Sequence, residues 1–143
     1  MSSERCEAAD LMHSAAIHLL RRVREVDARA MGISPARASA LSVLVFGGAR
    51  SLTELATAEQ VTNATMSKLV AAMERERLVR RHPDVNDARS IRIEATPKGR
   101  RLLERGRSKR LELLGRLLED ATDAEMAAVR TAATVLERAL ESG

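Results

Sequence analysis

The sequence predicts a mainly α-helical, single-domain protein with one small β-hairpin, and three observations lead to that fold class. Phe46 is the only aromatic residue, so the core must consist of Leu, Val, Ala and Met, which favours packed helices over a sheet sandwich. Apolar residues make up 45% of the chain and recur at three- and four-residue intervals through most of its length. Residues 90–95 instead alternate apolar and charged side chains, as a half-buried strand does.

Two helices are expected in the N-terminal third of the chain. Residues 8–30 carry a single apolar stripe, and Gly32 marks the end of the helix that it predicts. The Ser-Pro pair at 34–35 then begins a second helix, with Ser as the capping residue and Pro in the first turn. Two glycines at 47–48 end this helix.

A helix-turn-helix is expected in the middle of the chain. Residues 51–54, Ser-Leu-Thr-Glu, form a capping box that starts a short helix over 53–60. A tight turn at 61–63 follows, and Thr62 caps a further helix that extends to about residue 77. This helix has an apolar face with helical spacing, made of Met66, Leu69, Val70 and Met73. Two short helices with so tight a turn between them form a helix-turn-helix.

A β-hairpin follows the helix-turn-helix. Residues 78–83 and 90–95 are expected to be strands, and the polar segment 84–89 is expected to join them. Ile91 and Ile93 alternate with charged residues, so both are expected to anchor the hairpin to the core.

Two helices complete the chain. A Thr-Pro pair at 96–97 begins a long helix over 97–119, and a second capping box at 122–125 begins the last helix. The last helix carries an apolar seam at alternating intervals of three and four residues, made of Met126, Val129, Ala133, Leu136 and Leu140. Such a seam requires a partner helix.

Positive charge is concentrated in one segment. Residues 75–110 contain 13 Lys and Arg against 5 Asp and Glu, whereas the net charge of the whole chain is +4. A basic block on a mildly acidic body indicates a localised anion-binding surface. A solvated charged face would account for the same composition, so the interpretation depends on the helix and hairpin in which the block lies.

The outward face of the helix over 62–77 suits a DNA groove. With Met66 toward the core, alanines alternate with cations on the opposite face, and hydroxyl side chains lie on its flanks. Small residues let a helix enter a groove, and the polar ones reach base edges or phosphates. An ordinary solvated helix is the alternative, but the basic hairpin that follows favours DNA. The predicted DNA contacts of this helix are Thr62, Asn63, Ala64, Thr65, Ser67, Lys68 and Arg75.

A hairpin directly after a helix-turn-helix makes a winged helix. Arg89 is the candidate for insertion into the minor groove, because a narrowed groove has an enhanced negative potential. Asp87 either orients Arg89 through a charge-assisted hydrogen bond or only shapes the loop. The predicted contacts of the wing are Asp87, Arg89, Ser90, Arg80, Arg81 and Arg92. Arg75, Arg77, Arg80, Arg81 and Arg92 are the expected phosphate contacts.

The order of these elements resembles the MarR family of bacterial transcriptional regulators. The resemblance covers most of the chain, and its most specific parts are the D-x-R-S wing over 87–90 and the T-P-K-G-R sequence over 96–100. It implies a homodimer that binds double-stranded DNA at a palindromic operator. Residues 8–33 and 97–143 would then form dimerisation helices, and residues 34–96 the winged helix-turn-helix lobe.

The same resemblance implies a repressor that a small, often phenolic or aromatic, ligand releases from DNA. The ligand would enter a pocket between the dimerisation and DNA-binding regions, and His13, His18 and Leu41 are the candidate pocket residues.

Two features depart from the family pattern. Many members place an apolar residue and then Gly in the turn of the helix-turn-helix, where this chain has Glu59 and Gln60. The turn must therefore avoid positive φ or tolerate a residue other than Gly there. The peroxide-sensing branch pairs an N-terminal cysteine with tyrosines, whereas Cys6 lies beside two glutamates and the chain has no Tyr. Cys6 is expected to be an incidental thiol.

The sequence indicates no enzyme, cofactor or metal site. No nucleophile has an evident base, and no Gly-rich phosphate loop is present. His13 and His18 are five residues apart, which does not place them on one helical face as metal ligands. No signal peptide or membrane span is evident, so a soluble, cytoplasmic protein is expected. Two other functions use the same features: an architectural protein that binds DNA of any sequence, and a helical module that binds an acidic protein.

Overall fold

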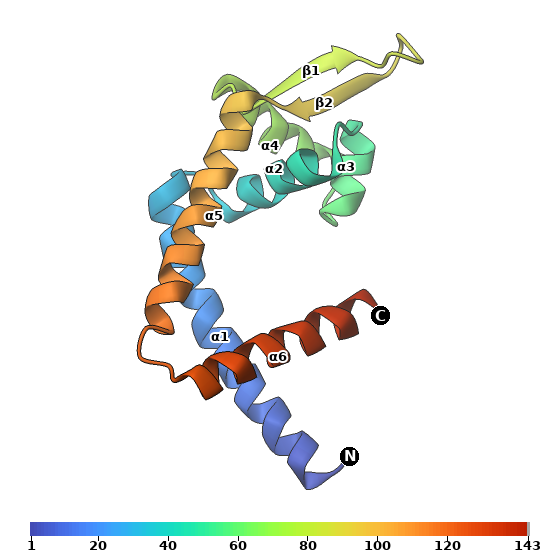
Figure 1. Ribbon diagram of the computed structural model, residues 1–143. Helices are drawn as coiled ribbons and strands as arrows, with labels where there is room; N and C mark the ends of the chain where they lie inside the picture. The colour runs from blue at the N-terminus through green and yellow to red at the C-terminus, as the bar shows by residue number, and fades with distance from the viewer. Residues whose placement is uncertain (143) are drawn as a thin grey trace. The chain divides into compact units, whose positions relative to one another are not determined.

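The computed structural model describes residues 1–142, which form helices and one two-stranded antiparallel hairpin (Figure 1). The elements in chain order are α1 (Ser3–Met31), α2 (Pro35–Gly47), α3 (Leu52–Ala58), α4 (Asn63–Arg75), β1 (Val79–Pro83), β2 (Ile91–Ala95), α5 (Pro97–Leu117) and α6 (Asp123–Glu141). The mainly helical fold class and the order of elements are as predicted. No single helix among these residues is both long and apolar enough to cross a membrane; only α1 and α2 taken together meet both conditions, and they are bent by 80° where they join.

Side-chain caps decide where the helices begin. Ser34, Ser51, Thr62 and Thr122 each accept the backbone N–H three residues on, as predicted for N-cap residues. The helix α1 starts five residues earlier than the apolar stripe predicts, because Ser2 caps it by accepting the N–H of Arg5. A polar first turn has no apolar periodicity, so the stripe could not reveal it.

The chain divides into two compact units, Met1–Arg110 and a second unit that begins at Leu111. The first unit contains α1–α4, the hairpin and most of α5, together with the core. This core is aliphatic, as the composition requires, and its fully buried large side chains are Leu41, Leu55, Met66, Val70, Met73, Val79 and Ile93.

The hairpin is tied to the helices at its inner end. Val79 pairs with Ala95, and the register continues to Pro83 and Ile91 at the outer end. Arg50, between α2 and α3, adds a bridge to Ile93 through hydrogen bonds of 3.0 and 2.7 Å. Ile93 is buried, as predicted, but the prediction for Ile91 is wrong, since 47% of its surface is exposed. Ile91 lies on the same face but two residues farther out, beyond the edge of the core.

The joint between the hairpin and α5 holds the end of α4 in place. The hydroxyl of Thr96 donates to the carbonyl of Arg77 at 2.6 Å and accepts the N–H of Gly99 at 3.1 Å. Gly99 packs so closely on the carbonyl of Leu78 that a Cβ atom would collide with it. The T-P-K-G sequence therefore forms a compact cap that α4, the hairpin and α5 share.

Candidate nucleic-acid interface

The turn between α3 and α4 uses a left-handed residue. Gln60 has a φ of 56°, and its N–H is bonded to the carbonyl of Thr57 at 3.1 Å. Val61 closes the turn by donating to the carbonyl of Ala56 at 3.0 Å. Of the two alternatives for this turn, the chain therefore adopts positive φ without Gly, at a conformational cost of about 1–2 kcal/mol. The helix-turn-helix geometry is kept.

The helix α4 has one buried and one exposed face. Met66, Val70 and Met73 are fully buried, and they set the rotation of the helix. The opposite face carries the exposed Ala64, Lys68 and Arg75 of the predicted DNA-contact set, with Ser67 and Ala71 half-buried at its edges. The predicted helix contacts thus belong to one surface of one helix, although its role in DNA binding stays a prediction.

Polar side chains at the N-terminus of α4 are held by local hydrogen bonds. The hydroxyl of Thr62 accepts the N–H of Thr65 and also donates to its hydroxyl at 3.0 Å. The side-chain amide of Asn63 donates to the hydroxyl of Thr53 on α3 at 3.2 Å. Asn63 is therefore oriented before any partner arrives, and its carbonyl oxygen stays available to a donor. Thr53 was not predicted, because only the fold brings α3 against this end of α4.

The wing loop is ordered by two aspartates. The carboxylate of Asp84 accepts the N–H of Asn86 at 2.8 Å, and that of Asp87 accepts the N–H of Arg89 at 3.0 Å. Asp87 also accepts the N–H of Ser90 with its carbonyl, at 2.9 Å. Asp87 thus shapes the turn through the backbone of Arg89, and in the part of the chain that the structure describes it makes no bond to the guanidinium. Of the two roles considered for Asp87, the structure therefore shows that it shapes the loop and does not orient the Arg89 side chain.

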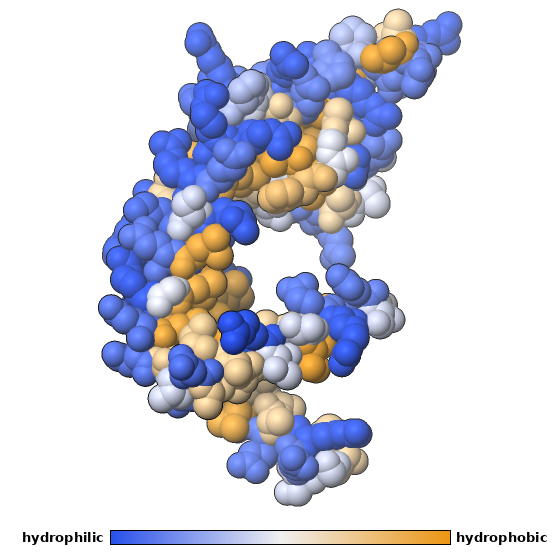
Figure 2. All heavy atoms as spheres, in the orientation of Figure 1, coloured by the Kyte–Doolittle hydropathy of each residue, from blue (hydrophilic) through white to orange (hydrophobic). Residues whose placement is uncertain are grey.

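The predicted basic contacts fall into two groups. Within residues 1–142, the charged ends of Lys68, Arg75 and Arg89 have no ion-pair or hydrogen-bond partner. The other group is paired: Arg80 with Glu94, Arg81 with Glu74, and Arg92 with Asp84 and Glu54. Figure 2 shows that hydrophilic side chains cover most of the hairpin, at the top of the view. The unpaired group is ready to bind phosphate, whereas the paired group already has anionic partners.

Arg92 makes the most extensive of these pairings. Its partners are 8 and 38 residues away in the chain. Glu54 was predicted only as the capping-box residue of α3, a role that it keeps by accepting the N–H of Ser51 at 3.4 Å. A contact between residues 38 positions apart leaves no periodic pattern in the sequence, so the ion pair of Glu54 with Arg92 could not be predicted from it.

A cavity of about 520 Å³ lies among α1, α2 and α5 in the first unit. Its apolar lining includes Leu20, Met31, Val45, Phe46 and Leu103, and its charged lining is Arg24, Asp27, Arg100, Glu104, Arg107 and Arg110. The three residues predicted for a pocket lie elsewhere: His13 and His18 are exposed on α1, and Leu41 is fully buried in the core. Leu41 does not line this cavity because its side chain is buried in the core, and the histidines do not line it because they lie nearer the N-terminus of α1. Their role in effector binding stays a prediction.

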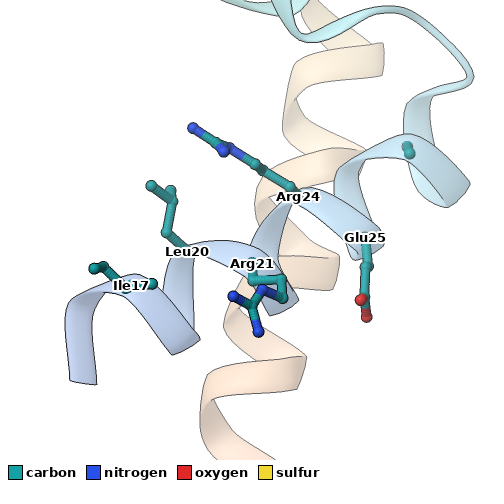
Figure 3. Close-up of a pocket in the computed structure, with 6 residues that line it drawn as sticks. Ile17, Leu20, Arg21, Arg24 and Glu25 are labelled. Carbon is teal, nitrogen blue, oxygen red and sulfur yellow. The ribbon is translucent and has the colours of Figure 1, made fainter. Parts of the chain in front are cut away.

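A second hollow of about 530 Å³ is lined by α1 alone (Figure 3). Ile17, Leu20 and Arg24 point to the same side of the helix there, as their spacing requires. Cys6 is exposed near the start of this helix. In the described part of the chain, no three His, Cys, Asp or Glu side chains are grouped to hold a metal ion.

Comparison with known proteins agrees with this architecture. The profile of the MarR family matches residues 31–90, which include α2–α4, β1 and the wing loop and end just before β2. The uncharacterised HTH-type transcriptional regulator YsmB of Bacillus subtilis is 32% identical over 117 residues, which are 82% of this chain and 79% of YsmB.

Solved structures show the same fold. A MarR family protein from Bacillus stearothermophilus superposes with a TM-score of 0.81 over 99% of both chains, at 29% identity. A mutant of S. aureus MepR, bound to an oligodeoxyribonucleotide, has a TM-score of 0.73 over 93% of this chain and 97% of its own, at 21% identity. The chain belongs to the MarR family of DNA-binding transcriptional regulators.

Proposed function

We propose that the protein is a repressor that binds a palindromic operator as a homodimer and leaves the DNA when a small effector binds. The observation that carries this proposal is the placement of the exposed α4 face and the arginine-bearing wing in one compact unit. A helix in the major groove reads base edges, and a wing arginine in the adjacent minor groove reads groove width. The oligodeoxyribonucleotide bound to the MepR mutant supports DNA as the partner.

Unpaired apolar faces support the homodimer. The helix α6 has no buried residue, and Val129, Leu136 and Leu140 of its predicted seam are exposed. On α1, Leu11 is 65% exposed, and Met31 is the only buried residue. Helices with an apolar stripe and nothing to cover it require a partner. A second copy of the chain would also present two α4 helices to successive major grooves, about 34 Å apart.

The cavity among α1, α2 and α5 supports effector binding. Its volume suits a small organic molecule, and it offers the only aromatic side chain, Phe46. Arginines outnumber carboxylates in its lining, and Arg110 is paired with Asp27 at 2.7 Å. We therefore propose a small aromatic effector that bears a negative charge. Benzoate should raise the melting temperature more than the neutral benzamide, and equal shifts would contradict the charge preference.

Operator binding is tested by fluorescence anisotropy with two labelled duplexes. One contains a palindrome from the promoter of the protein's own gene, and the other contains the same bases in scrambled order. Titrations at two salt concentrations should give a specificity ratio of about 10³ or more in favour of the palindrome. Equal affinities for both duplexes would contradict the proposal and favour an architectural protein. No binding to either duplex at low salt would favour the protein-binding module.

A further inference from the structure

Arg92, on β2, bridges two carboxylates from different parts of the fold. Its Nε donates to Oδ2 of Asp84 at 2.8 Å, and its Nη1 donates to Oε2 of Glu54 at 2.9 Å. Asp84 begins the wing loop, and Glu54 lies in the first turn of α3. The Arg92 side chain is 32% exposed, and that of Asp84 is 15% exposed. One guanidinium therefore joins the wing loop to the helix-turn-helix.

Both carboxylates are themselves anchored to the backbone. Asp84 accepts the N–H of Asn86, and Glu54 accepts the N–H of Ser51 in the capping box. The bonds from Asn86 and Arg92 hold the pKa of Asp84 below its usual value, and the same carboxylates raise the pKa of Arg92. Asp84 and Arg92 therefore stay charged at neutral pH. Because neither carboxylate rotates independently, the bridge fixes the position of the wing loop relative to α3 and does not merely attract the two.

The bridge lies where the hairpin leaves the core. Ile93 is buried and bonded to Arg50, so the inner half of the hairpin is fixed. Farther out, Ile91 is exposed, and Val85 in the loop is 97% exposed. In the described part of the chain, the Arg92–Glu54 pair is the outermost side-chain bond between the hairpin and the helices. Without it, the outermost tie is the pair of Arg81 with Glu74, and beyond that pair the wing has only its own strand pairing to hold its direction.

We propose that Arg92 is a positioning residue that holds the wing at a fixed angle to α3 and α4, so that Arg89 and Lys68 reach adjacent grooves together. The proposal rests on the proposed DNA-binding function. This positioning role replaces the phosphate contact that the sequence predicts for Arg92. Arg92 lies between two carboxylates, so the three groups together carry a net negative charge, which repels phosphate.

Conservative variants separate positioning from phosphate contact. Arg92→Lys keeps the charge, which is enough for a phosphate contact, but an ammonium lacks the planar fork that reaches two carboxylates at once. Asp84→Asn keeps the loop acceptor, and Glu54→Gln keeps the capping box, but each loses the charge. The matched control is Glu76→Gln, which removes a charge from the same unit outside both the bridge and the hairpin, where Glu76 is paired with Arg37 of α2 at 2.6 Å.

The first measurement is operator affinity by anisotropy, with melting temperatures to establish folding. We expect Arg92→Lys, Asp84→Asn and Glu54→Gln each to weaken binding by about five- to tenfold, the range of remote positioning residues. The Arg92→Lys/Asp84→Asn double variant should lose little more than either single variant, because both break one bridge. Glu76→Gln should bind as tightly as wild type or more tightly. If removal of Asp84 or Glu54 charge strengthens binding and Arg92→Lys binds normally, Arg92 contacts phosphate and the proposal is overturned.

The second measurement needs no DNA. ¹⁵N relaxation of the protein reports the mobility of the Val85 and Asn86 amides, and we expect lower order parameters in Arg92→Lys and Glu54→Gln but not in Glu76→Gln. Unchanged order parameters in all variants would overturn the proposal. If wild type binds no operator but the loop becomes mobile in the variants, the proposed function fails while the bridge between wing and helix stands.

Discussion

Arg89 combines an ordered backbone with an unpaired charge. Its N–H is held by Asp87 at 3.0 Å, and its guanidinium has no partner within residues 1–142. The loop therefore presents this side chain without first having to break an ion pair. We expect Arg89→Ala to weaken operator binding and to lower the slope of log K against log salt by about one.

Anisotropy titrations over a range of salt concentrations measure this slope. Arg5→Ala is the matched control, because it removes an exposed arginine from the first turn of α1, far along the chain from the wing. It should leave the slope unchanged. The same slope for Arg89→Ala and wild type would remove Arg89 from the interface.

Asp84 gives the wing a defined response to acid. The N–H of Asn86 and the guanidinium of Arg92 hold its pKa below the usual 3.8. A carboxyl group whose pKa is lower in the folded state stabilises that state above its unfolded pKa, and this contribution is lost as the pH falls through the folded value. We expect the ¹³C shift of the Asp84 carboxyl to titrate with a midpoint below 3.8, and the Asn86 amide to follow it. In Arg92→Met the midpoint should move up toward 3.8; a wild-type midpoint at or above 3.8 would contradict the bonding described.

At the scale of elements, α4 separates residues that stabilise the helix from residues that face outward. Thr62 caps the helix, whereas Ala64 is exposed and makes no such bond. Thr62→Ala should lower the free energy of unfolding by about 1 kcal/mol, measured by urea denaturation. Ala64→Leu should change it by less than about 0.5 kcal/mol but weaken operator binding by about tenfold or more, because a large side chain holds the helix away from the groove. Normal binding by Ala64→Leu would exclude this face from the major groove.

The elements themselves were largely predictable, and the errors have physical causes. Caps such as Ser51 and Thr62, with the apolar spacing around Met66, are local signals, so they identify the helices without tertiary information. The alternation at Ile91 and Ile93 correctly predicts that both share a face. Alternation does not tell how far the core extends along that face, which is why the burial of Ile91 was predicted wrongly.

At the scale of the whole molecule, the exposed apolar seam of α6 predicts that the protein is more stable as a dimer than as a monomer. Leu136 lies in this seam and is 39% exposed. Leu136→Asp should shift the protein toward monomer in sedimentation equilibrium, because a carboxylate in an apolar interface is costly to desolvate. The melting temperature of wild type should rise with protein concentration, and that of Leu136→Asp should not. Glu137→Gln, next in the chain but outside the seam, should remain as dimeric as wild type, and a dimeric Leu136→Asp would place the interface elsewhere.

The sequence alone determined the order of helices and hairpin, the aliphatic core, and the positive charge on the outward face of the 62–77 helix and on the hairpin. Each of these depends on periodicity, capping or composition within a short segment. Only the tertiary structure decided which charges are paired. Arg89 and Arg92 look alike in the sequence, yet one has no partner in the described chain and the other bridges Asp84 and Glu54. The cavity was likewise decided by packing, since its lining comes from α1 and α2 together with α5, which lies far from both in the chain. Ion pairs and cavities depend on distances between segments, and those distances exist only once the chain has folded.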